Sequence, residues 1–103
     1  INGKVQQAPL ALGSATSLKE GVLVPVEHRY PTWTGETVAT RYSPDIEWYY
    51  LSGIDDDERL IIKCADSRDD VAKRTPHTAF VDPRSPAGAK PRESIEVRCL
   101  VFG

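Results

Sequence analysis

The stretch IEWYYLSGIDDDERLIIKCA, residues 46–65, decides the fold class. Its first part, residues 46–53, is rich in the aromatic and β-branched side chains that are typical of a strand. Residues 59–65 form a second apolar run, and the acidic turn at 54–58 between the two runs predicts a hairpin. This turn lacks the spaced oxygen ligands and closing glutamate of a calcium loop, so we interpret it as a solvated turn. The stretch therefore predicts antiparallel β-structure.

Further strand patterns lie on both sides of this hairpin. Apolar or alternating runs predict strands at 22–27, 37–42, 77–80 and 93–102. Because proline cannot donate to a ladder, Pro25 makes the first of these an edge strand or an extended segment. Residues 1–21 show no sustained period and are expected to be an irregular lead-in to one partial domain that spans 1–103, with the strands in 22–103. The fold expected is all-β and antiparallel, with little helix: a sandwich, a jelly roll or part of one.

Composition narrows the classes of function. The chain has 103 residues, with 13 basic and 15 acidic side chains well mixed and a net charge of −2, so nothing suggests a nucleic-acid partner. Its apolar runs are too short to span a bilayer, and we expect no membrane partner. Two cysteines, Cys64 and Cys99, are too few for a disulfide framework or a zinc site, and they predict small buried side chains in a reduced, cytoplasmic protein. The chain begins at Ile1 and contains no methionine, which suggests a piece of a longer protein.

The last third of the chain carries the residues with recognisable chemistry. His77 opens the run HTAF, and a loop leads from it to Arg92-x-Ser94. Imidazole is the commonest neutral ligand of first-row metals. An arginine fork beside a serine hydroxyl suits a small carboxylate. The other histidine, His28, has no carboxylate two residues later, and we interpret it as a surface histidine at the end of a strand.

The sequence segments around these residues resemble those of a known protein family. The stretches WYYLSGIDDDERLIIKCADSRDDVAKRTPHTAF (48–80) and PRESIEVRCLVF (91–102) closely resemble the C-terminal part of a family of mostly fungal hydroxylase/desaturases. That family includes the gibberellin-desaturase type and is related to the cephem-methoxylation proteins. QQAPLAL (6–12) and YPTWTGETVATRY (30–42) match its pattern too, so the resemblance covers nearly the whole chain.

The resemblance implies the C-terminal half of a jelly roll that oxidises a small natural product in secondary metabolism, using iron(II) and 2-oxoglutarate. It implies that His77 is an iron ligand, and that Arg92 and Ser94 hold the distal carboxylate of the cosubstrate. Tyr49 or Tyr50 is expected to line the pocket, with the choice between them open. No residue is expected to be catalytic beyond these metal and cosubstrate ligands.

The chain departs from the family pattern in one respect. The resemblance implies an upstream His-x-Asp that supplies two further iron ligands, and this chain contains none. We therefore expect the isolated chain to be inactive. Its expected partners are the preceding half of its own domain, or further copies that pair with its exposed strand edges. The alternative is a small non-catalytic all-β binding domain, or a degenerate paralogue that has lost its iron.

Overall fold

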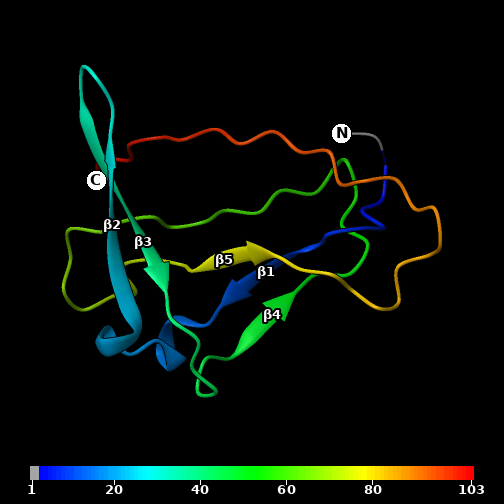
Figure 1. Cartoon of the computed structure of the whole chain (residues 1–103), viewed down its shortest axis with the longest axis horizontal. Coiled ribbons are helices and arrows are strands. Elements are labelled where there is room, and N and C mark those ends of the chain that lie inside the picture. Colours follow the sequence, from blue (N-terminus) through cyan, green and yellow to red (C-terminus); the bar gives the residue numbers. More distant parts are fainter. Residues whose placement is uncertain (1–2) are drawn as a thin grey trace.

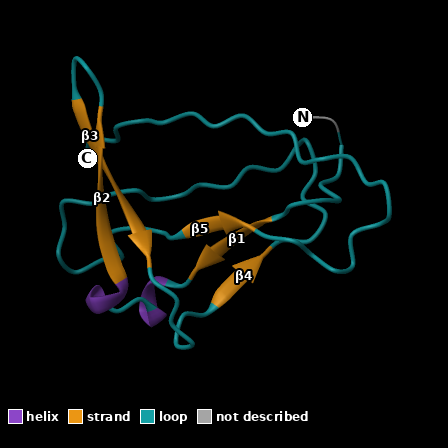
Figure 2. Ribbon diagram, viewed as in Figure 1, coloured by secondary structure: helices purple, strands orange, loops and turns teal. Residues whose placement is uncertain are grey.

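The computed structural model describes residues 3–103 as two antiparallel sheets. The first sheet has the order β4-β1-β5, formed by Trp48–Tyr50, Leu10–Gly13 and His77–Ala79. The second is a hairpin of β2, Leu23–Arg29, and β3, Thr34–Thr40. Figure 1 shows the three-stranded sheet at the centre, with the turn of the hairpin projecting beyond it. The only helical elements described are the 3-10 turns Ala15–Ser17 and Glu20–Val22 (Figure 2). The all-β antiparallel class with little helix is confirmed, and this arrangement is consistent with part of a jelly roll.

The central strand β1 lies inside the segment that the sequence predicted to be irregular, so that prediction is wrong for residues 10–13. Its residues alternate between half-buried and buried, and the buried positions are the small Ala11 and Gly13. A side chain at Gly13 would meet the Pro76 ring at 3.3 Å and Ile46 at 3.6 Å. Small residues with weak strand propensity are needed here because neighbouring segments pack closely on this face. The local sequence pattern does not reveal that requirement, because the neighbouring segments are distant in the sequence.

The hairpin agrees closely with the sequence. Predicted strands at 22–27 and 37–42 correspond to β2 and β3, which are each a few residues longer or shifted toward the turn. Because β2 pairs only with β3 in the described chain, Pro25 lies on an edge strand as expected, opposite Val38. At the tip, the rings of Tyr30 and Trp33 stack with centroids 4.4 Å apart.

Two other predicted strands are not formed. Residues 59–65 and 93–102 run as extended chain without a ladder, drawn as long loops in Figure 2, so the predicted hairpin across the acidic turn is wrong. Most of their apolar side chains lie in solvent: Ile61 is 97% exposed and Phe102 is 88% exposed, whereas Ile62 is half-buried. Cys64 and Cys99, expected to be buried, are exposed thiols on the same two segments. An alternating pattern identifies a strand-forming sequence, but a strand also requires a partner for its backbone groups.

The chain accordingly buries little apolar surface. Among residues 3–103, the buried hydrophobic side chains are Ala11 and Ile46. The radius of gyration is 15.8 Å, whereas a compact domain of this length has about 13 Å. The three-stranded sheet therefore positions the candidate site, while much of the remaining strand-forming sequence lacks the layer it would pack against.

Candidate functional site

His77 is the first residue of β5, at the edge of the three-stranded sheet. Its side chain is exposed, and Nδ1 lies 3.0 Å from the backbone carbonyl of Thr75. A carbonyl oxygen can only accept, so Nδ1 must carry the proton in this hydrogen bond. The lone pair of neutral His77 is then on Nε2. Metal-binding histidines are commonly held in this way, with one ring nitrogen donating to a carbonyl and the other free to coordinate.

The register of the sheet shows what shares a face with His77. Leu12 pairs with His77 on one side and with Tyr49 on the other, so the three residues form one row across the sheet. Directly opposed residues in an antiparallel sheet point to the same face. Tyr50 instead pairs with Ala11 and lies on the opposite face. The sequence left this choice open because the two tyrosines are adjacent, and only the pairing with β1 distinguishes them.

Arg92 and Ser94 contact each other, although the strand expected to carry them is absent. Arg92 Nη1 donates to Ser94 Oγ at 2.8 Å, and its Nε donates to the carbonyl of Ala8 at 2.9 Å. This leaves the remaining guanidinium N–H groups and the Ser94 hydroxyl hydrogen able to bind an anion. No hydrogen bond or ion pair in the described part of the chain joins His77 to this pair.

Two other features of the sequence, His28 and the acidic turn at 54–58, were interpreted as non-ligands. His28 is exposed near the end of β2, on the separate hairpin, and its Nε2 bonds Thr37 Oγ1 at 2.9 Å. In the acidic turn, the Glu58 carboxylate accepts from the Asp55 amide, which closes the turn. Within residues 3–103, no three side chains of His, Cys, Asp or Glu gather as a metal site would require. His77 can therefore supply one metal ligand, and this stretch of chain does not complete the set.

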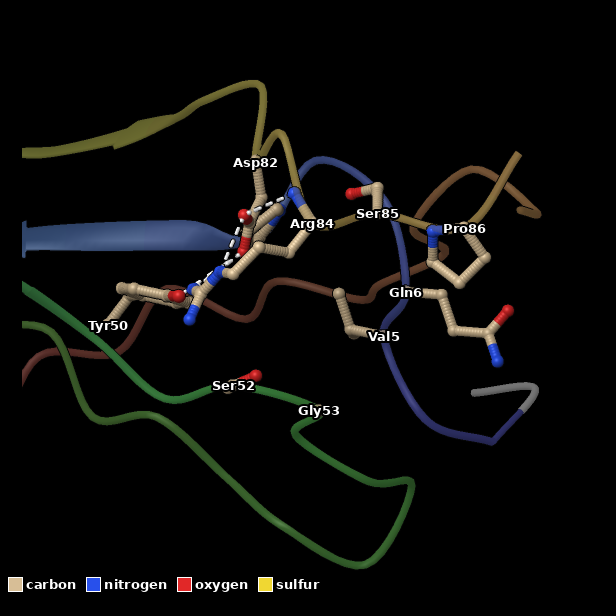
Figure 3. A pocket seen from close by; sticks show the side chains of 10 residues that line it. Val5, Gln6, Tyr50, Ser52, Gly53, Asp82, Arg84, Ser85 and Pro86 are labelled. Carbon is tan, nitrogen blue, oxygen red and sulfur yellow. Dashed lines mark hydrogen bonds and ion pairs between the residues drawn. The ribbon is translucent and has the colours of Figure 1, made fainter. Parts of the chain in front are cut away.

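A pocket of about 280 Å³ lies elsewhere, around Tyr50 (Figure 3). Its polar centre was missed by the sequence analysis: Arg84 makes two bonds to the Asp82 carboxylate, at 2.9 and 3.0 Å, and the Tyr50 hydroxyl donates to the same carboxylate at 3.2 Å. The guanidinium also lies 5.6 Å from the centre of the Tyr50 ring. Because Asp82 neutralises Arg84 and would repel an anion, this pocket is unsuited to a dicarboxylate. The cluster ties the loop after β5 to β4, and the spacing Asp-Pro-Arg at 82–84 is its only local signal.

Comparison with known proteins identifies the family of the chain. A family model described as an oxidoreductase/YMDC permease-like domain matches residues 1–102. The chain belongs to this family. In the described residues, no helix is long and apolar enough to cross a membrane.

Several curated relatives carry more specific names. A hydroxylase/desaturase of Aspergillus flavus is 42% identical over 95% of this chain and 50% of its own length. A hydroxylase/desaturase of Penicillium oxalicum is 34% identical over 99% of the chain and 39% of its own length. Residues covering 60% of the chain are 50% identical to a protein of Aspergillus novofumigatus named an Fe(II)/2-oxoglutarate-dependent dioxygenase, and cover 22% of it. The resemblance to fungal hydroxylase/desaturases is thus confirmed. The chain spans half or less of the length of these relatives.

Proposed function

We propose that these residues are the C-terminal part of an iron(II)- and 2-oxoglutarate-dependent oxygenase that hydroxylates or desaturates a small natural product. The observation that carries this proposal is the state of His77: its Nδ1 proton is engaged by the Thr75 carbonyl, which leaves Nε2 as a ligand on an open face of the sheet. The names of the relatives, a hydroxylase/desaturase and an Fe(II)/2-oxoglutarate-dependent dioxygenase, support the reaction class.

His77 would hold the iron, and Arg92 with Ser94 would hold the distal carboxylate of 2-oxoglutarate. When bound, the iron supplies the activation of dioxygen. Arg92 offers charge-assisted donors, and its bond to Ala8 fixes the direction of the guanidinium. Ser94 accepts from Arg92 and can donate its own hydrogen to the same carboxylate. The two remaining iron ligands would come from the preceding half of the domain, since relatives are at least twice as long.

The proposal is tested in the longer protein that carries these residues, or in a fusion that supplies the front half from the Aspergillus flavus relative. Iron(II)-dependent conversion of 2-oxoglutarate to succinate should fall to background in His77→Ala and persist in His28→Ala, the matched control. Unchanged succinate formation in His77→Ala would remove the iron assignment.

A second arm addresses the cosubstrate site. Arg92→Lys keeps the charge but loses the fork, so the KM for 2-oxoglutarate should rise about tenfold or more, as loss of a charge-assisted hydrogen bond implies. A KM equal to that of the wild type in both Arg92→Lys and Ser94→Ala would contradict the assignment.

One observation favours a second candidate, a non-catalytic β-domain: within residues 3–103, no three side chains of His, Cys, Asp or Glu gather as an iron site would require. If the longer protein consumes no 2-oxoglutarate with iron(II), this alternative replaces the enzyme.

A further inference from the structure

We infer that Tyr49 and Leu12 form the substrate-contacting wall of the His77 site, and that the substrate is a neutral, largely apolar compound. This inference rests on the proposed function, because it assigns residues to the same site. It begins from the row Tyr49–Leu12–His77, in which each residue is paired with Leu12 and all three share one face of the sheet.

On this face of the three-stranded sheet, His77 and Tyr49 are both exposed. Along β1, Ala11 and Gly13 are buried on the other face, whereas Leu10 and Leu12 are half-exposed. Tyr49 is 61% exposed. By contrast, Tyr50 is occupied on the far face, edge-on to Phe80 and bonded to Asp82. Of the two adjacent tyrosines, Tyr49 is therefore the one free to meet a ligand beside His77.

The spacing of the row suits a small molecule. Neighbouring strands lie about 4.8 Å apart, so the backbones of Tyr49 and His77 are separated by about 10 Å with Leu12 between them. The imidazole of His77 and the phenol of Tyr49 would lie on either side of a small molecule, and Leu12 would contact it from below with an apolar side chain. A carbon skeleton resting on Leu12 would lie beside Nε2 of His77.

The row Tyr49–Leu12–His77 runs across the strands, and this direction indicates which ligand Tyr49 would contact. Arg92 is anchored at Ala8, four residues before Leu12 in the chain, which is at most about 13 Å along the line of β1. A cosubstrate bound between His77 and Arg92 would extend along the strands. Tyr49 lies across the strands, on β4, away from that line. It would therefore contact the organic substrate and not 2-oxoglutarate.

The charge beside Tyr49 indicates the class of substrate. The Tyr49 hydroxyl donates to Glu47 Oε2 at 3.1 Å, and the Glu47 backbone is itself held by Ser14 and Ser17. A carboxylate in this position repels anions. Together with the apolar side chain of Leu12, it favours a neutral apolar skeleton over an acidic metabolite.

The position of Tyr49 is tested by fluorine NMR of 3-fluorotyrosine in the longer protein or the fusion, with manganese(II) in place of iron and with 2-oxoglutarate. Each tyrosine signal is assigned by a Tyr→Phe variant. Manganese should broaden the Tyr49 signal more than those of Tyr50 and Tyr42, and His77→Ala should abolish this broadening. Broadening that depends on His77 but is greater at Tyr50 overturns the wall assignment alone. Broadening that survives His77→Ala contradicts the proposed iron site itself.

The role of Tyr49 is tested by comparing two activities: conversion of 2-oxoglutarate without organic substrate, and formation of the organic product. Tyr42→Ala should leave conversion of 2-oxoglutarate without organic substrate within about twofold of wild type, and Tyr49→Ala should lower formation of the organic product. Deletion of the gene identifies the metabolite that the enzyme forms in culture. In Tyr49→Ala, the amount of this metabolite should fall about tenfold or more, the loss expected when an aromatic contact of about 1.4 kcal/mol is removed. Tyr42→Ala, a truncation at a 91% exposed tyrosine, is the control. Normal metabolite levels in Tyr49→Ala overturn the inference.

Discussion

At the scale of single residues, one backbone carbonyl sets the tautomer of His77. The Thr75 carbonyl can only accept, so it selects the Nδ1–H tautomer of neutral His77. Nitrogen-detected NMR at mildly alkaline pH should show Nδ1 of His77 protonated and Nε2 bare. His28, whose Nε2 contacts a hydroxyl that can donate or accept, is the internal comparison. A proton on Nε2 of His77 would contradict the ligand geometry.

A second prediction at this scale concerns Asp70. The Arg68 guanidinium hydrogen-bonds its carboxylate and lowers the pKa of Asp70 below that of an ordinary aspartate. A depressed folded-state pKa contributes stability above the unfolded pKa, and that contribution is lost as the pH falls through the folded value. Carbon NMR titration of Arg68→Ala should show the pKa of Asp70 rising toward normal.

The pKa of Asp66 provides the control in the same titration. It is lowered first by the Lys63 side chain and then by the backbone amide of residue 68, neither of which changes in Arg68→Ala. Equal shifts at Asp66 and Asp70 would show that the variant perturbs the whole segment and would contradict the pairwise account.

At the scale of elements, the hairpin tip depends on Gly35. A Cβ at this position would overlap with the Trp33 ring that stacks on Tyr30. Gly35→Ala should displace the ring and cost about 1 kcal/mol, the worth of an aromatic pair. Loss of ring-current shifts in the NMR spectrum would report it. Gly21→Ala, where nothing lies within 4 Å, should be neutral; equal effects would contradict the steric explanation.

Unpaired strand sequence gives another prediction at this scale. Within residues 3–103, the amides of 94–102 take part in no strand ladder, and in the isolated chain they should exchange with solvent far faster than those of β1. In the longer protein, the same amides should become protected. Hydrogen exchange read by mass spectrometry distinguishes the two states, and slow exchange of 94–102 in the isolated chain would contradict the structure described here.

An element could be predicted only where the residues that determine it lie close together in the sequence. The strands at 22–27 and 37–42 could be predicted because each carries a local strand pattern, but such a pattern does not show which strands pair, and the hairpin expected at 46–65 does not form. The strand β1 could not, because Ala11 and Gly13 are small to admit neighbours about 35 to 65 residues away. For the site, Arg92 and Ser94 could be predicted to meet because they are two residues apart. The row that joins Tyr49 to His77 could not, since it runs through β1.

At the scale of the whole molecule, residues 3–103 form an open structure that buries little apolar surface. Most apolar residues of the extended segments lie in solvent, and His77 and Tyr49 are exposed on one face of the three-stranded sheet. We propose that a preceding half of the domain would cover these surfaces, including Cys64 and Cys99, and supply two further iron ligands. Exposed strand edges also template self-association, so the isolated chain should form concentration-dependent oligomers in sedimentation experiments. A strictly monomeric, compact species would contradict this.

The central claim is that this chain contributes one part of an iron and 2-oxoglutarate site. The most direct measurement is succinate formation from 2-oxoglutarate under air with iron(II), made in parallel on the isolated chain and on the longer protein. We predict no turnover above background for the isolated chain, and turnover in the longer protein that His77→Ala abolishes. Turnover by the isolated chain that is lost in His77→Ala, or turnover by the longer protein that is indifferent to His77, would contradict it.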